Sequence, residues 1–158
     1  LSLSFFTACS VSEEDALERS KAIFTDSFSS NTQEQNTEGN QLALFLPKGV
    51  EVTDETEYNM QLEKNGQVFL LFFLPIEPWD STVNLDRDRE FEQEAVVFEE
   101  LETENKHGYL VITPSEDGQY KLIVGMGGAK LTTLASAGDL AESTEMMTSI
   151  LHSIKYND

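Results

Sequence analysis

The spacing of apolar side chains predicts a helix near the start of the chain. Between residues 12 and 27 apolar positions recur at helical intervals, with Phe24 and Phe28 on one face. Ser12 is followed by three acidic residues. This is a favourable helix start, because a serine can cap the first turn and carboxylates complement the positive end of the helix dipole. Residues 29–40 contain no apolar side chain and predict a flexible polar linker. The helix either docks on the rest of the chain or serves as a spacer.

A pattern typical of strands begins at Gln41. Residues 58–63 alternate between apolar and polar side chains, as expected of a strand that is buried on one face. Asn65-Gly66 directly after them is a strong hairpin signal, because both residues tolerate positive φ. Residues 68–74 are apolar on both faces and predict a central strand that is covered on both sides. Three further strands separated by turns predict an antiparallel meander, at residues 95–101, 109–113 and 120–126.

The end of the chain predicts an amphipathic helix. Asp139 and Glu142 have the spacing of a capping box, in which the first side chain caps the helix and the second reaches back to it. An apolar stripe follows, made of Leu140, Met147, Leu151 and Ile154. Such a stripe is typical of a helix that packs on a core, and a groove for a partner is the alternative. Strands followed by a helix that lies on them predict an α+β fold, with an antiparallel β-sheet packed against helices.

The first ten residues resemble the end of a bacterial export signal. An apolar opening is followed by small residues, as at the cleavage site of a signal peptide. Phe6-Thr7-Ala8-Cys9 is similar to the lipobox of bacterial lipoproteins, in which a small residue and then Gly or Ala precede the Cys. In that family the Cys becomes the mature N-terminus and carries the lipid through its sulfur. The alternative is a lone buried cysteine that packs as a small apolar side chain.

This resemblance implies an organisation into three parts. Residues 1–8 would be the end of a signal peptide, and residues 9–40 a lipid-anchored segment that holds the N-terminal helix and the polar linker. Residues 41–158 would form a single α+β domain, which is a common domain size. Acyl chains on Cys9 would hold this domain at the cell membrane, on the extracytoplasmic side, because each buried CH₂ group contributes about 0.8 kcal/mol.

The order of the predicted elements also resembles a known fold. The strand-rich body opens with residues 46–52. It closes with a hairpin, a Gly-rich connection and the amphipathic helix, which ends in residues 150–156. This layout is similar to the PsbP/Mog1-like fold of several bacterial surface lipoproteins, in which a curved antiparallel sheet lies between helices. The resemblance implies an α/β sandwich over residues 41–158. It also implies a binding or assembly-accessory role rather than an enzymatic one.

The charge balance narrows the choice of partner. The chain has 29 acidic and 10 basic side chains, for a formal net charge of −19. A surface this negative repels phosphate backbones, which argues against nucleic acid and favours a protein or peptide with a basic face. Residues 125–133 are rich in glycine, but their spacing does not fit a nucleotide-binding loop, so neither a nucleotide nor another cofactor is expected. The glycines favour a strand end with a close backbone approach.

Residues 77–94 are predicted to form an acidic, irregular loop, and this loop is the candidate partner-binding site. A tryptophan on a loop can anchor a partner, and the carboxylates around it suit a basic one. The candidate contacts are Trp79, Asp80, Asp86, Asp88 and Glu90. In the alternatives, the tryptophan folds back over the core, and the acids form a solvated loop or a weak calcium site. His107 and His152 lie far apart in the sequence, and no zinc or other dedicated metal site is expected.

Together these patterns favour a lipid-anchored binding or assembly-accessory module of the cell envelope. The chain has no sequence motif of nucleophilic catalysis, and no catalytic residue can be chosen among its 29 acids. An extracytoplasmic hydrolase with a dispersed carboxylate or histidine site is the alternative, since catalytic triads are recognised by geometry rather than by spacing. A third interpretation is a structural spacer that holds a domain away from the membrane.

Overall fold

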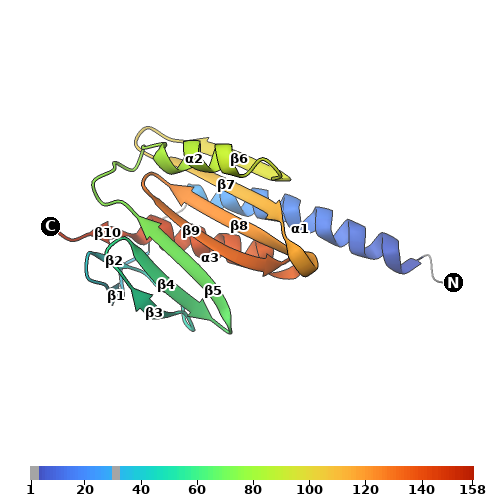
Figure 1. The fold of residues 1–158 in the computed structure, drawn as a ribbon, viewed down its shortest axis with the longest axis horizontal. Helices are drawn as coiled ribbons and strands as arrows, with labels where there is room; N and C mark the ends of the chain where they lie inside the picture. Colours follow the sequence, from blue (N-terminus) through green and yellow to red (C-terminus); the bar gives the residue numbers. More distant parts are fainter. Residues whose placement is uncertain (1–3, 30–32) are drawn as a thin grey trace.

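A computed structural model describes residues 4–29 and 33–158, with side chains from residue 12 onward. Within these residues, ten strands form two antiparallel sheets, and three α-helices pack against the larger sheet (Figure 1). This arrangement confirms the predicted α+β fold, including a C-terminal helix that packs on the sheet. The parts of the signal peptide and of the polar linker that are predicted at residues 1–3 and 30–32 lie outside the described residues.

The larger sheet has the strand order β3-β4-β5-β9-β8-β7-β6, and each neighbouring pair is antiparallel. Its strands are β3 (Glu51–Glu55), β4 (Asn59–Lys64), β5 (Gln67–Phe73), β6 (Val97–Glu102), β7 (His107–Pro114), β8 (Gln119–Met126) and β9 (Ala129–Ser136). The smaller sheet has the order β1-β2-β10, formed by Thr37–Glu38, Leu42–Leu44 and Lys155–Tyr156. The helices are α1 (Ser4–Phe28), α2 (Val83–Phe91) and α3 (Leu140–Ser153), and two short 3₁₀ turns are η1 (Glu116–Gly118) and η2 (Ala137–Asp139).

The helices divide unequally between the two faces of the larger sheet. α1 and α3 cover one face, and α2 lies against part of the other (Figure 1). Successive side chains of a strand point to opposite faces, and β7 shows the result. Leu110 and Ile112 join the main core beneath α1 and α3, whereas Tyr109 and Val111 form a smaller second core with Leu85 of α2. Within the described residues, α2 covers the β6–β8 part of its face and no helix covers the β5–β9 part.

α1 docks on the body of the protein, which is one of the two arrangements that its sequence left open. Phe24 is fully buried, Phe28 is nearly so, and the centroids of their rings are 5.8 Å apart. Gly108 in β7 lies directly beneath the Phe28 ring, and a Cβ atom at this position would overlap the ring. The absence of a side chain on β7 therefore lets the helix approach the sheet closely.

The two ends of the chain meet in two places. α1 packs along α3, more than a hundred residues later in the sequence. In the smaller sheet, β2 pairs with β10, so that Leu42 lies opposite Tyr156. Next to this sheet the side chain of Gln35 donates a hydrogen bond to the Ser153 carbonyl at 2.6 Å. The core is thus closed by segments from both ends of the sequence.

Two predictions for the N-terminal part are corrected. α1 begins at Ser4 instead of near Ser12, because residues 4–11 contain no Gly or Pro that would end a helix. The segment after α1 is not wholly without structure, since β1 pairs with β2. The Asn36 side chain also donates to the Leu46 carbonyl at 3.0 Å and accepts from the Leu46 amide at 2.9 Å. Hydrogen bonds from a polar side chain order this segment without apolar burial.

The strand predictions hold in part. The Asn65-Gly66 hairpin between β4 and β5 is confirmed, as is the meander β6-β7-β8. β5, however, is covered on one face only, because Phe69, Leu71 and Phe73 are buried while Val68 and Leu70 are exposed. β9, a central strand of the sheet, is missing from the prediction. Three of the four side chains on its face opposite the core are polar, those of Lys130, Thr132 and Ser136, and its flanking glycines resembled a connection.

Two further expectations are corrected near the helices. The segment 77–94 is not irregular throughout, because it contains α2, whose apolar contact with the second core depends on Leu85. Asp139 precedes α3 but does not cap it with its side chain. Its carboxylate instead accepts a hydrogen bond from the Ser136 hydroxyl at 3.1 Å. The apolar stripe of α3 is buried in the main core, as a core-facing helix requires.

Candidate functional site

The face of the larger sheet that α2 leaves uncovered carries apolar side chains. Val68 and Leu70 of β5 and Leu134 of β9 have exposed fractions of 39%, 51% and 49%. Leu70 lies opposite Thr132 in the β5–β9 ladder, and Leu134 lies opposite Lys121 in the β9–β8 ladder. Residues opposite each other share a face of the sheet, so these side chains form one surface. Contiguous exposed apolar surface on a folded protein is typical of an interaction site.

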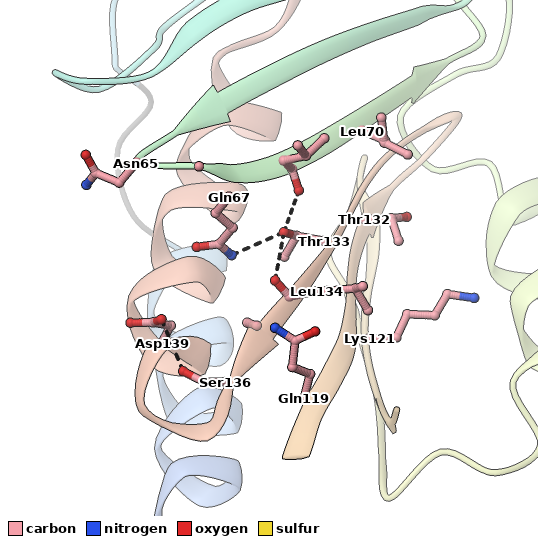
Figure 2. Close-up of a pocket in the computed structure, with 13 residues that line it drawn as sticks. Asn65, Gln67, Leu70, Gln119, Lys121, Thr132, Thr133, Leu134, Ser136 and Asp139 are labelled. Atoms are coloured by element: carbon pink, nitrogen blue, oxygen red, sulfur yellow. Dashed lines mark hydrogen bonds between the residues drawn. The ribbon is translucent and has the colours of Figure 1, made fainter. Parts of the chain in front are cut away.

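This surface is hollowed into a groove, which we call the sheet groove (Figure 2). Its larger part has a volume of about 680 Å³, and shared lining residues connect it to a second hollow of about 340 Å³. Ligand sites commonly have volumes of roughly 300–1,000 Å³. The groove is defined by the apolar residues Val68, Leu70, Phe72, Ile123 and Leu134, the polar residues Gln67, Gln119, Thr132 and Thr133, and the basic residues Arg87, Lys121 and Lys130.

Hydrogen bonds fix two polar side chains beneath one end of the groove, on the face of the sheet that α3 covers, where Gln67 Nε2 also donates to Ser143 Oγ at 3.2 Å. Thr133 Oγ1 donates to the Val68 carbonyl at 2.7 Å, and Gln67 Nε2 donates to Thr133 Oγ1 at 3.1 Å (Figure 2). Gln119 and Thr132, in contrast, make no side-chain hydrogen bond within the described residues. An amide and a hydroxyl are therefore available in the groove to bond a ligand.

Three basic side chains lie where α2 meets the sheet. Lys121 pairs with Glu92 at 3.0 Å, and Lys130 pairs with Asp88 at 2.9 Å. Arg87 forms no ion pair within the described residues, and it lines the smaller hollow. Neither Asp88 nor Glu92 is part of the lining. At this point the groove therefore presents ammonium and guanidinium groups, with the matching carboxylates behind them.

Asp88 belongs to a buried polar cluster beneath α2. The residue is 4% exposed, and its carboxylate accepts hydrogen bonds from the Tyr109 hydroxyl at 2.6 Å and from the Lys130 ammonium at 2.9 and 3.1 Å. Burial, together with the nearby Asp88 charge, raises the pKa of Tyr109 far above its usual value, so the hydroxyl remains a donor. The cluster connects α2 to β7 and β9 and thereby fixes one wall of the groove.

The structure distributes the five candidate contacts among different environments. Trp79 stacks on Tyr156, with ring centroids 5.4 Å apart and ring planes within 8°, and packs against the main core. This arrangement agrees with the alternative prediction, in which the tryptophan side chain folds back over the core. Asp88 is buried, whereas three carboxylates are exposed, those of Asp80, Asp86 and Glu90. The five side chains do not share one exposed surface, and partner binding through them stays a prediction.

In the glycine-rich segment 125–128, Gly127 and Gly128 form the tight turn between β8 and β9. Gly127 has a φ of 56°, a conformation that favours glycine, and a Cβ atom on it would overlap the backbone at Trp79. Two residues earlier, in β8, Gly125 lies against the Tyr109 ring. The close backbone approach predicted for this segment is confirmed.

The side chains with strongly shifted pKa values lie away from the sheet groove. Burial lowers the pKa of His152 to about 4, and Lys106 Nζ lies 3.3 Å from its Nδ1. Burial also raises the pKa of Tyr156 well above its usual value. Within the described residues, neither of these groups nor Tyr109 lines the groove, where a general acid or base of a hydrolase would be expected.

Three further observations bear on metal and membrane binding. Over the side chains that the structure describes, those of residues 12–29 and 33–158, no three His, Cys, Asp or Glu are grouped so that they could hold a metal ion. None of the described helices, including the 25-residue α1, combines the length and apolar character needed to cross a membrane. Cys9 lies within α1, but its side chain is not among those described, so lipid attachment there stays a prediction.

Sequence reasoning did not identify the sheet groove. The available signal was the segment 68–74, whose apolar side chains alternate onto both faces of the strand. Burying both faces of this strand requires helices on both sides of the sheet. The sequence contains long amphipathic helical patterns only near its two ends, and both of these helices cover the same face. Comparison with known proteins does not name the groove either: no protein-family model matches this chain, and no curated protein matches it.

Proposed function

We propose that this protein is a lipid-anchored binding module of the cell envelope and that the sheet groove is its binding surface. The observation that carries the proposal is the exposed apolar trio Val68, Leu70 and Leu134, which lies in a hollow of ligand size. Covering such side chains stabilises a complex, because removing apolar surface from water contributes about 25 cal/mol per Å². Binding or assembly-accessory work requires a surface of this kind and no catalytic group.

The proposed lipid anchor is Cys9, on the extracytoplasmic side of the cell membrane. α1 packs on the face of the sheet opposite the groove, and its N-terminal end extends beyond the edge of the sheet (Figure 1). Attachment through that end would leave the groove open to the surroundings. The flexible acyl chains would hold the module at the surface without restricting its orientation.

Recovery of the protein from native membranes tests the anchor. We expect intact-mass spectrometry to give the mass of a chain that is cleaved before Cys9 and carries acyl chains, because two or three chains are needed for stable membrane attachment. The Cys9→Ser variant should move to the soluble fraction. An unmodified Cys9 in the membrane fraction would contradict the anchor.

Substitution in the groove tests the binding surface. Leu70→Asp places a carboxylate among the apolar side chains, and we expect it to reduce recovery of the components that co-purify in mild detergent by about tenfold, which corresponds to roughly 1.4 kcal/mol. The matched control is Ile76→Asp, which makes the same change at a residue that is 90% exposed and lies outside the groove. Equal recovery with both variants would rule out the groove as the binding surface.

A further inference from the structure

We propose that the sheet groove binds an amphiphilic ligand with an anionic head group and an apolar chain. This inference rests on the proposed function, since it names the ligand class of the same groove. The head group would lie in the smaller hollow, beside the three basic side chains, and the apolar chain would lie along β5 and β9 in the larger hollow.

The charged side chains that line the groove are mostly basic, whereas those of the whole protein are mostly acidic. The chain has 10 basic and 29 acidic side chains. The lining of the two hollows contains three basic residues, Arg87, Lys121 and Lys130, and within the described residues one acidic residue, Asp139. Asp139 lines only the larger hollow, whereas all three basic residues line the smaller one. Glu92 and Asp88 balance the charges of Lys121 and Lys130, so the net positive charge at the smaller hollow comes from Arg87, and it attracts an anion and fixes its orientation in the groove.

The basic side chains retain donors for a bound anion. Lys130 donates two hydrogen bonds to Asp88, but an ammonium group has three donors. Lys121 pairs with Glu92 alone. Arg87 makes no ion pair within the described residues, and a guanidinium offers five N–H donors in a planar fork. A carboxylate or phosphate ester between these groups would therefore accept charge-assisted hydrogen bonds, which are about twice as strong as neutral ones.

The apolar part of the ligand has a matching surface. Leu70 lines both hollows and so connects the basic end of the groove to the exposed side chains of Val68 and Leu134. Other occupants fit these observations less well. An extended peptide binds by adding a strand to a sheet edge, whereas the groove lies on the face of central strands. A second copy of the chain would bring a net charge of −19 against −19.

Three single-chain probes that differ only in the head group test the proposal: dodecanoate, dodecyl maltoside and dodecyltrimethylammonium, each below its critical micelle concentration. The protein is the 158-residue chain with Cys9→Ser, so that no acyl chain of its own competes. We expect saturable binding of dodecanoate by isothermal titration calorimetry, and binding of the neutral and cationic probes that is weaker by about tenfold or more, the effect of losing one or two hydrogen bonds to charged groups.

Variants locate the two parts of the ligand. The double variant Arg87→Gln with Lys121→Gln should weaken dodecanoate binding by about tenfold and leave dodecyl maltoside binding unchanged. Arg19→Gln is the matched control, because Arg19 is an exposed arginine on α1, which packs on the opposite face. Leu70→Asp should abolish binding of every probe. Lys130 is left intact, since it also holds the buried cluster beneath α2.

Each contrary outcome has a defined meaning. Neutral or cationic probes that bind as tightly as dodecanoate would overturn the anionic head group and leave the groove as a binding surface. If no probe binds and Leu70→Asp still loses the components recovered from membranes, the amphiphilic ligand is wrong and the proposed function stands. If no probe binds and Leu70→Asp keeps those components, both proposals fail.

Discussion

Replacing Asp88 by alanine is expected to lower the free energy of unfolding by about 3–5 kcal/mol, the usual result of removing one partner from a buried ion pair. The substitution leaves the Lys130 ammonium and the Tyr109 hydroxyl without their acceptor in the interior beneath α2. It also releases the connection between α2 and the sheet. Urea unfolding followed by circular dichroism measures the loss, with the slope of the transition as a check that the variant unfolds in the same way.

The control for this substitution is Asp86→Ala in the same helix. Asp86 is exposed, and among the described residues its carboxylate accepts a side-chain hydrogen bond from the nearby Thr82 hydroxyl alone, at 3.0 Å. Both variants remove one negative charge from a chain with a net charge of −19, so the difference between them isolates the buried contacts. We expect Asp86→Ala to change the free energy of unfolding by about 0.5 kcal/mol or less. Similar effects of the two substitutions would contradict the role of Asp88.

Phe24→Ala is expected to lower the free energy of unfolding by about 3–5 kcal/mol, as is usual when a large core side chain leaves a cavity. Phe24 is fully buried and contacts the Phe28 ring, so its removal weakens the packing of α1 on the main core. Thermal or urea unfolding gives the change. Limited proteolysis adds a local measure, since we expect faster cleavage within α1 once the helix detaches more often.

The matched control is Phe91→Ala, which removes the same side chain from α2. Phe91 is 72% exposed and belongs to neither core cluster. We expect this substitution to change the free energy of unfolding by about 0.5 kcal/mol or less. If Phe24→Ala changed the free energy of unfolding as little as Phe91→Ala, α1 would contribute little to the stability of the protein. The alternative interpretation of α1 as a spacer would then be favoured.

The features that the sequence predicts correctly depend on neighbours in the chain. Asn65 and Gly66 adopt φ values of 50° and 82°, and the two-residue turn between β4 and β5 needs only those conformations. The apolar stripe of α3 repeats at helical spacing, so it identifies a buried face without knowledge of what covers it. Such features are determined by residues close together in the chain, so they can be predicted from a single sequence.

The features that the sequence does not predict depend on distant residues. Asp88 lies in an acidic segment that is typical of a protein surface. It is buried because Tyr109 and Lys130, from two separate strands, donate hydrogen bonds to its carboxylate. β9 becomes central only because β5 and β8 pair with it on either side. The sheet groove exists because α2 is too short to cover the whole face. The contacts of Asp88, the pairing of β9 and the incomplete cover by α2 all depend on residues distant in the sequence. None of them produces a recognisable pattern in the neighbouring residues.

The contacts between N-terminal and C-terminal elements determine when the core of this protein can close. β10 pairs with one side of β2 and α1 packs along α3, so the main core is not closed on these sides until residue 156 is present. Contacts between such distant residues carry a large loop-closure entropy, which delays their formation. We therefore expect the core of a nascent chain to close only after β10 has been synthesised. Under the proposed export, a chain whose core is not yet closed would also be the form that passes through a narrow translocation channel.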